Sequence, residues 1–275
     1  MLDVGLVSAR IDTLASVQAK AILSCLSLDL QYGRRRVFSD VSFDLFQQET
    51  LCLIGSQENG KSSLLRCLNR TAELDRGACQ GGRIFLDRRD VFDPSWDVTF
   101  VRRQVALVPQ VSNPFPASIW DNIAYVLKLH RIASGQHDIG DRIEEALRLV
   151  GIWGEVKDDL HKTPVHQMSP VIQRQVCIAR ALALEPRVLL LDEPSVGLGG
   201  LSMQQLETIL CRLKQNLAIV VATQSLEVTA QIADRIAHLD QGTMQEVDCA
   251  ELILTNAQNP VTRRFVEAHA QGMIS

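Results

Sequence analysis

The sequence predicts an α/β fold in which a largely parallel, buried sheet is preceded by two antiparallel strands and interrupted by a helical insert. Residues 188 to 191 and 218 to 221 are apolar at every position, which is typical of parallel strands buried on both faces. Residues 37 to 46 alternate between apolar and polar side chains, which indicates a half-buried strand. Between about 111 and 170 the apolar residues recur at helical spacing.

The antiparallel pair and the strands that follow it occupy the first part of the chain. Residues 21 to 30 are rich in strand formers and end at Gln31-Tyr32-Gly33, so we expect them to form a hairpin with residues 37 to 46. The elements expected next are a strand over 51 to 54, a helix through Leu64, Leu65 and Leu68, and strands over 83 to 86 and 104 to 108.

The helical insert and the remaining sheet occupy the second part. Ile143, Ala146, Leu147 and Val150 share one helical face. Glu144 precedes Arg148 by four residues, which favours an ion pair on that helix. Helices over 172 to 184 and 201 to 214 are expected between the last strands.

Composition and charge narrow the class of protein. The 275 residues are 46% hydrophobic and 22% charged, so the chain can bury a sizeable core. Its formal net charge of −4 argues against nucleic-acid binding, which requires a basic surface. The seven cysteines form no CxxC pair, and we interpret them as core residues in a reducing compartment. No run approaches the ~18 apolar residues of a membrane-spanning helix, so any membrane role would come through a partner.

A phosphate-binding loop is predicted at Gly55-Ser56-Gln57-Glu58-Asn59-Gly60-Lys61-Ser62, which matches the pattern GxxxxGK[ST] between a strand and a helix. Such a loop turns backbone N–H groups toward an anion at a helix N-terminus. Lys61 would reach the outer phosphates, and the Ser62 hydroxyl could bind Mg²⁺. The sequence therefore predicts nucleotide binding.

Polar residues at three other strand ends could complete this site. Asp192 and Glu193 follow a buried strand, where the first could hold Mg²⁺ and the second could orient or deprotonate water. Tyr32 could stack on adenine, although a lone strand tyrosine is more often only half-buried. Gln110 could contact Mg²⁺ or water, although a loop glutamine is usually just solvated.

These residues together resemble the nucleotide-binding subunit of ABC transporters, as do residues 168 to 182 and Leu191-Asp192-Glu193-Pro194. Within that superfamily the chain is similar to the ATP-binding subunit of bacterial phosphate importers (the Pst type). The segments that carry this likeness are Ser112-Asn113-Pro114-Phe115-Pro116-Ala117-Ser118-Ile119-Trp120-Asp121-Asn122, Leu65-Arg66-Cys67-Leu68-Asn69-Arg70, Trp153-Gly154-Glu155-Val156-Lys157-Asp158-Asp159-Leu160-His161 and Phe92-Asp93-Pro94. The resemblance covers about residues 22 to 267.

The resemblance implies a P-loop NTPase core of the ABC type with an antiparallel β subdomain and an inserted α-helical subdomain. Residues 1 to 21 would be an N-terminal extension, 22 to 250 the nucleotide-binding domain with the helical subdomain at about 111 to 174, and 251 to 275 a helical tail. The implied nucleotide-binding residues are Tyr32, Gly55, Ser56, Gln57, Glu58, Asn59, Gly60, Lys61, Ser62, Ser63 and Ser169. Ser62, Gln110 and Asp192 would bind Mg²⁺, and Glu193 would be catalytic with Gln224 in place of the family's switch histidine.

The resemblance also implies the partners and the activity. The chain would bind ATP and Mg²⁺ and couple ATP hydrolysis to the inward transport of inorganic phosphate. It would lie peripherally on the cytoplasmic face of the inner membrane, with a second ATP-binding subunit in a homodimer or mixed dimer. Two membrane-spanning permease subunits would contact residues 113 to 116, and a periplasmic or extracellular phosphate-binding protein would act through them. No nucleic acid is expected.

Several positions depart from the family pattern. The family's Leu-Ser-Gly-Gly-Gln signature reads Met168-Ser169-Pro170-Val171-Ile172, where Pro170 has no N–H to offer a phosphate. Gln224 has no proton to exchange near neutral pH. In the loop Ser195-Val196-Gly197-Leu198-Gly199, Gly199 replaces an aspartate. Glu58 replaces a glycine, so a left-handed backbone there would cost roughly 1–2 kcal/mol.

These departures affect hydrolysis more than binding, because the residues expected to hold MgATP and orient water remain, namely Lys61, Ser62, Gln110, Asp192 and Glu193. A homodimer would place both the altered signature and the missing histidine in each of its two sites. We therefore expect the chain to work beside an intact ATP-binding subunit. The alternatives are a nonhydrolytic or weakly hydrolytic regulatory subunit and an importer subunit for another anion. A DNA-maintenance ATPase would need long heptad segments or a basic surface, which this sequence lacks.

Overall fold

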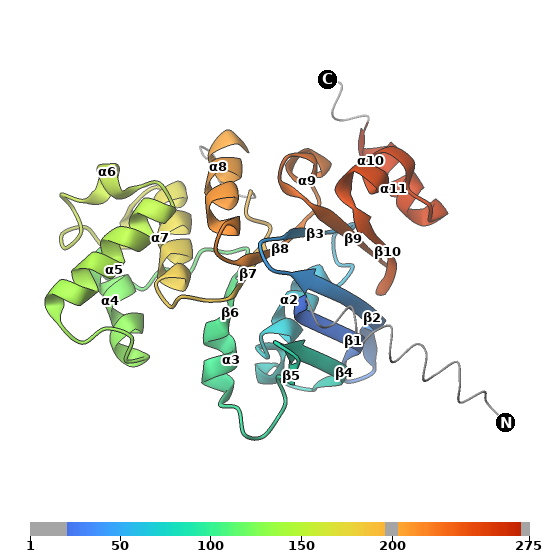
Figure 1. The fold of residues 1–275 in the computed structure, drawn as a ribbon, viewed down its shortest axis with the longest axis horizontal. Helices are drawn as coiled ribbons and strands as arrows, with labels where there is room; N and C mark the ends of the chain where they lie inside the picture. Colours follow the sequence, from blue (N-terminus) through green and yellow to red (C-terminus); the bar gives the residue numbers. More distant parts are fainter. Residues whose placement is uncertain (1–20, 196–202, 271–275) are drawn as a thin grey trace.

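The computed structural model describes residues 21–195 and 203–270. Its strands form a four-stranded sheet in the order β2-β1-β4-β5 and a six-stranded sheet in the order β10-β9-β3-β8-β7-β6 (Figure 1). This is the predicted α/β fold with an antiparallel β subdomain and a helical region.

The four-stranded sheet is antiparallel and contains the predicted hairpin. Its strands are β1 (Ala21–Tyr32), β2 (Arg35–Phe46), β4 (Ala78–Leu86) and β5 (Arg89–Asp90). β4 is longer than the predicted strand over 83 to 86, because it pairs with β1 from Ala78 onward despite its glycines. Gly82 has φ +83°, and a Cβ there would lie 2.3 Å from the Ser27 carbonyl oxygen, so glycine allows this close approach.

The six-stranded sheet is parallel except for its edge strand β10. Its strands are β3 (Thr50–Ile54), β6 (Val105–Val108), β7 (Val188–Asp192), β8 (Ala218–Thr223), β9 (Arg235–Asp240) and β10 (Thr243–Cys249). Leu189 and Leu191 of β7 enter the core on one face, and Val188 and Leu190 enter the core on the other. Burial on both faces explains why this strand is apolar at every position.

The helices lie around this sheet. The helical elements of the core are α2 (Lys61–Leu68), η1 (Ala72–Leu74), α3 (Val98–Gln104), α8 (Met203–Lys214) and α9 (Leu226–Ile232). Those of the insert and its return are α4 (Ile119–Leu129), α5 (Gln136–Leu149), α6 (Trp153–Val156), η2 (Val165–Gln167) and α7 (Pro170–Leu182). The last two are α10 (Ala250–Asn256) and α11 (Pro260–Ala270). In Figure 1 α4 to α7 gather at one end of the molecule, and α10 and α11 lie beyond β9 and β10.

The helical insert contains the ion pair that the sequence predicts. The Glu144–Arg148 ion pair is confirmed at 2.6 Å. β9, β10 and α3 were not predicted. β9 carries Arg235, His238 and Asp240, so it lacks the apolar run that marks β7. The expected N-terminal extension lies almost wholly outside the described residues, since β1 already begins at Ala21.

The cysteines and the helix lengths bear on two further predictions. Cys25, Cys52, Cys67 and Cys177 are buried as expected, whereas Cys79, Cys211 and Cys249 are exposed, so the interpretation of the cysteines as core residues is wrong for those three. Cys79 lies on β4, where the pleat turns it outward. Every helix within 21–195 and 203–270 is too short or too polar to span a bilayer.

Candidate nucleotide site

The predicted phosphate loop connects the end of β3 to the start of α2. Gly60 caps α2 with φ +94°, and a Cβ there would press on Val37 at 3.1 Å. Gly55 has φ +147°, and a Cβ there would lie only 2.1 Å from the Leu239 carbonyl oxygen. Both positions therefore require glycine, and the loop keeps the tight path that brings backbone N–H groups to a helix N-terminus.

Two unusual residues of the loop have different orientations. Glu58 has φ +66°, so the predicted left-handed backbone is confirmed, and its exposed side chain lines the cavity beside the loop. Asn59 instead donates from Nδ2 to Asp240 Oδ1 at 3.0 Å. Its amide is thus engaged with the end of β9 and not with the cavity, which leaves its assignment to nucleotide binding without side-chain support.

Lys61 is the buried cation of the loop. Its Nζ donates to the carbonyl oxygens of Gly55 at 2.6 Å and Ser56 at 2.9 Å. Burial lowers the pKa of the ammonium, while the nearby carboxylates of Glu193 and Asp192 act in the opposite direction. The ammonium therefore lies across the loop, where it can also reach an anion in the cavity.

Ser62 and Asp192 meet at the base of the site, although 130 residues separate them in the sequence. The Ser62 hydroxyl donates to Asp192 Oδ1 at 3.0 Å. Burial raises the pKa of Asp192, which the bond from Ser62 partly offsets and the charge of Glu193 reinforces. A hydroxyl and a carboxylate held together in this way are oxygen ligands of the kind Mg²⁺ prefers, so these residues fit a bound Mg²⁺.

The cost of burying Asp192 leads to a prediction. Because its pKa is raised on folding, the ionised carboxylate opposes folding at neutral pH, and this penalty disappears as the pH falls through the raised pKa. We expect Asp192→Asn to stabilise the nucleotide-free protein at pH 7 by about 1 kcal/mol. The variant should also lose any strengthening of ATP binding by Mg²⁺. Denaturant unfolding over a pH series, with ATP titrations, measures both effects.

The control for this prediction is Asp97, whose pKa is lowered by its hydrogen bond to the N–H of Thr99. Asp97→Asn at the start of α3 should not stabilise the protein. A stability gain for Asp192→Asn that grows as the pH falls would contradict the assigned cause.

Glu193 follows Asp192 at the end of β7 and is buried, with φ +42°. Its backbone N–H donates to the Ala222 carbonyl oxygen at 2.8 Å, which ties it to the neighbouring strand β8. Gln224 donates to the carboxylate from its backbone N–H at 3.4 Å and from Nε2 at 3.3 Å. The two residues predicted to be catalytic thus contact each other.

Tyr32 closes the other side of the site. Its hydroxyl donates to Asp75 Oδ2 at 2.8 Å, and Asp75 also accepts from Arg66 of α2 at 2.6 Å. Desolvation and the bond to Asp75 raise the pKa of the tyrosine. The ring is therefore held through its hydroxyl at the end of β1, and Tyr32 lines the cavity.

A cavity of about 460 Å³ joins these elements, within the ~300–1,000 Å³ typical of small-molecule sites. The predicted residues that line it are Tyr32, Gln57, Glu58, Gly60, Lys61, Ser62, Ser63, Gln110, Glu193 and Gln224. Gly55, Ser56, Asn59, Asp192 and Ser169 are not among the lining residues. Arg35 and Val37 line it and were not predicted, although their position just after Tyr32 in the hairpin was a signal for them.

Ser169 and Pro170 begin α7 as the sequence predicts. The Ser169 hydroxyl accepts from the Ile172 N–H at 3.3 Å, and Pro170 is the first helical residue. Both are exposed, so this helix start is open to a partner. Ser169 does not line the cavity of its own chain. Residues 196 to 199 of the expected coupling loop lie outside the described residues.

Arg174 of α7 is a residue that sequence reasoning missed. Its side chain is 1% exposed, and its guanidinium donates to backbone carbonyl oxygens at the ends of both β6 and β7. An arginine between the apolar residues Ile172 and Val176 was the available signal.

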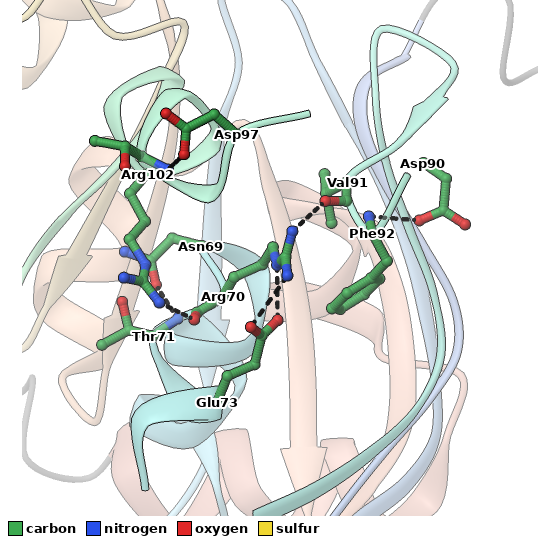
Figure 2. Close-up of polar contacts among 10 residues, drawn as sticks. Asn69, Arg70, Thr71, Glu73, Asp90, Val91, Phe92, Asp97 and Arg102 are labelled. Carbon is green, nitrogen blue, oxygen red and sulfur yellow. Dashed lines mark hydrogen bonds and ion pairs between the residues drawn. The ribbon is translucent and has the colours of Figure 1, made fainter. Parts of the chain in front are cut away.

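A polar network ties the end of α2 to the segment that leads into β6. Figure 2 shows Arg70, whose guanidinium binds both carboxylate oxygens of Glu73 and the carbonyl oxygen of Val91. The same guanidinium lies 5.0 Å from the centre of the Phe92 ring. Arg102 of α3 donates to the Arg70 carbonyl oxygen at 2.8 Å. The chain just after α2 is thus joined to Val91 and to α3, the helix that leads into β6.

The segment at 112 to 122 is held by a buried asparagine. The Asn122 Nδ2 donates to the carbonyl oxygens of Phe115 and Ala117, both at 3.1 Å, and its Oδ1 accepts from the Phe115 N–H at 2.8 Å. The guanidinium of Arg180 lies 4.5 Å from the centre of the Phe115 ring. Apolar side chains remain exposed on and beside this segment, namely Val111, Phe115, Tyr125 and Leu129.

A phosphate loop and an acidic strand end on a parallel sheet together define a P-loop nucleotide-binding protein. Residues 38 to 196, more than half of the chain, match the ABC transporter family, so the chain belongs to that family and carries its ATP-binding domain.

Solved structures show the same fold. A bacterial Atm1-family ABC exporter with ATP bound is 22% identical, with a TM-score of 0.74 over 91% of this chain. The chain spans 42% of that exporter chain. cbiO1 from Clostridium perfringens, part of the ABC transporter complex cbiONQ, is 20% identical, with a TM-score of 0.73 over 93% of this chain and 100% of cbiO1.

Proposed function

We propose that the chain is the ATP-binding subunit of an ABC importer resembling the phosphate importer, and that it couples ATP binding and hydrolysis to inward transport of inorganic phosphate. The main support for the ATPase activity is that Lys61, Ser62, Gln110 and Glu193 all line the same cavity. Lys61 and the loop N–H groups would bind phosphates, and Glu193 would accept a proton from water.

The Mg²⁺ ion would be held by Ser62, Gln110 and Asp192. The hydrogen bond between Ser62 and Asp192 supports this assignment, and Gln110 lines the cavity at the end of β6. The chemistry that Mg²⁺ supplies is neutralisation of charge on the phosphate oxygens. Tyr32 would stack on the adenine while its hydroxyl stays bonded to Asp75.

The segment at 112 to 122 supports the importer part. Its sequence resembles that of phosphate importers, and a hydrogen bond from Asn122 to the Phe115 carbonyl oxygen stabilises its conformation. Apolar side chains are exposed beside it. We assign this surface to two membrane-spanning permease subunits, through which a phosphate-binding protein would deliver the solute. cbiO1, which has the same fold, is itself part of a transporter complex. The chain would lie on the cytoplasmic face of the membrane, with the domain limits expected from the sequence.

A second ATP-binding subunit would complete each site. The exposed start of α7 at Ser169 supports contact with a partner's nucleotide. Pro170 and Gln224 favour a mixed dimer with an intact subunit over a homodimer.

The same residues favour the second candidate function, a nonhydrolytic or weakly hydrolytic regulatory subunit. An importer subunit for another anion is the third, because in the proposed assembly the binding protein and the permeases, and not this chain, would contact the solute.

Uptake measurements in cells that lack the gene test the transport function. We expect uptake of labelled phosphate to fall without the chain, to return with the wild type and to stay low with Lys61→Ala, because the site would lose its phosphate-binding cation. Lys157→Ala changes an exposed lysine and should restore uptake. Loss of sulfate uptake with normal phosphate uptake would contradict the phosphate assignment and support the other-anion candidate.

A further inference from the structure

Arg174 is a buried cation that is paired with carbonyl oxygens. Its Nη1 donates to the carbonyl oxygens of Pro109 and, at 3.0 Å, Gln110. Its Nη2 donates to the carbonyl oxygens of Asp192 at 2.8 Å and Glu193 at 3.3 Å. These acceptors lie at or just after the ends of two neighbouring parallel strands, since Val108 of β6 pairs with Leu191 of β7. One side chain of α7 therefore holds both strand ends.

Burial of this guanidinium is costly, because its charge loses water and no carboxylate side chain is bonded to it among the described residues. Burial lowers the pKa of Arg174, although arginine remains charged in proteins. An apolar side chain would fill the same space at lower cost. The planar guanidinium has one property that an apolar chain lacks, since it presents donors in a fixed arrangement to several acceptors at once.

We propose that Arg174 is a positioning residue of the nucleotide site, which holds the backbone of Gln110 and of Asp192-Glu193 in one arrangement and makes that arrangement depend on the position of α7. This inference rests on the proposed function, because it concerns the residues assigned to Mg²⁺ and water. Ser169 caps the start of the same helix, about 7.5 Å earlier along its axis. A shift of that exposed helix start therefore moves the group that sets the geometry of the chain's own site.

The next residue of α7 provides a matched control. Gln175 is also buried, and its Nε2 donates to the Val150 carbonyl oxygen at 2.9 Å. That acceptor lies at the end of α5 and outside the nucleotide cavity. Replacing Gln175 thus removes a buried hydrogen bond from the same helix without touching the strand ends.

The experiment uses the full chain with Arg174→Met, Arg174→Lys and Gln175→Met. Two affinities are measured calorimetrically, that for ATP in EDTA and that for Mg²⁺ at saturating ATP, together with the unfolding temperature. We expect Arg174→Met to weaken Mg²⁺ binding by about tenfold or more while ATP binding in EDTA is nearly unchanged. Gln175→Met should lower the unfolding temperature and leave the Mg²⁺ affinity intact.

The conservative variant keeps the test decisive if Arg174→Met does not fold. Lysine keeps the charge but cannot reach both strand ends with a planar group, so Arg174→Lys should show an intermediate, selective loss of Mg²⁺ affinity. Three results would each overturn the positioning role alone. The first is an equal loss of ATP and Mg²⁺ affinity in either Arg174 variant, and the second is an unchanged Mg²⁺ affinity in Arg174→Lys. The third is the same selective loss of Mg²⁺ affinity in Gln175→Met. A wild-type chain that binds no ATP in either condition would overturn the proposed function and this role with it.

Discussion

Replacing Glu193 with glutamine is expected to lower the rate of ATP hydrolysis by about 100-fold or more. The glutamine keeps the shape of the side chain and can still accept from Gln224, but it cannot take a proton from water. ATP binding should change little, because the phosphates would be held by Lys61 and the loop. The assay is steady-state hydrolysis by the chain mixed with an ATP-binding subunit that has a complete signature but whose own hydrolytic site is inactivated, so that only this chain's site turns over. An ATP titration is measured on the same mixture.

The matched control for this variant is Glu227→Gln, which changes an exposed carboxylate in the first turn of α9 and should leave turnover unchanged. If Glu193→Gln supports transport as well as the wild type, the hydrolytic role is wrong and the regulatory role is favoured. Equal loss of ATP affinity and turnover would show that the substitution disturbs the binding site itself.

Restoring the signature glycines is expected to have the second large effect. In the chain alone, Pro170→Gly with Val171→Gly should raise hydrolysis by about 10-fold or more, because a phosphate in the partner site would regain a backbone N–H donor. The gain has a stability cost, since proline favours the first position of α7 and each glycine costs roughly 0.5–1 kcal/mol. Hydrolysis rates and denaturant unfolding of the same preparations measure both.

Pro170→Ala separates the effect of the missing N–H from the effect of the side chain, because it restores the N–H while keeping a Cβ. We expect a smaller rise than with the glycine pair. Adding Gln224→His should increase turnover further, since histidine can exchange a proton near neutral pH. Rapid hydrolysis by the unmodified chain would refute the claim that these positions limit turnover.

How far the sequence predicts this protein can be judged from particular residues. The phosphate loop was predictable because its pattern is local, and the alternation of Val188 and Leu190 with Leu189 and Leu191 between two cores explains why β7 was recognised. β9 was missed because a strand that pairs in parallel with β3 can still carry polar residues, here Arg235, His238 and Asp240. Propensity alone does not detect a strand whose stability comes from its neighbours.

The sequence by itself determined the α/β fold, the phosphate loop and the family, because each depends on residues close together in the chain or on a pattern repeated along it. Only the tertiary structure brought Ser62 to Asp192, Gln224 to Glu193 and Arg174 to the ends of β6 and β7. These contacts join residues from different strands and helices, so they depend on strand order and register. Those follow from the packing of the whole sheet and are written in no single segment.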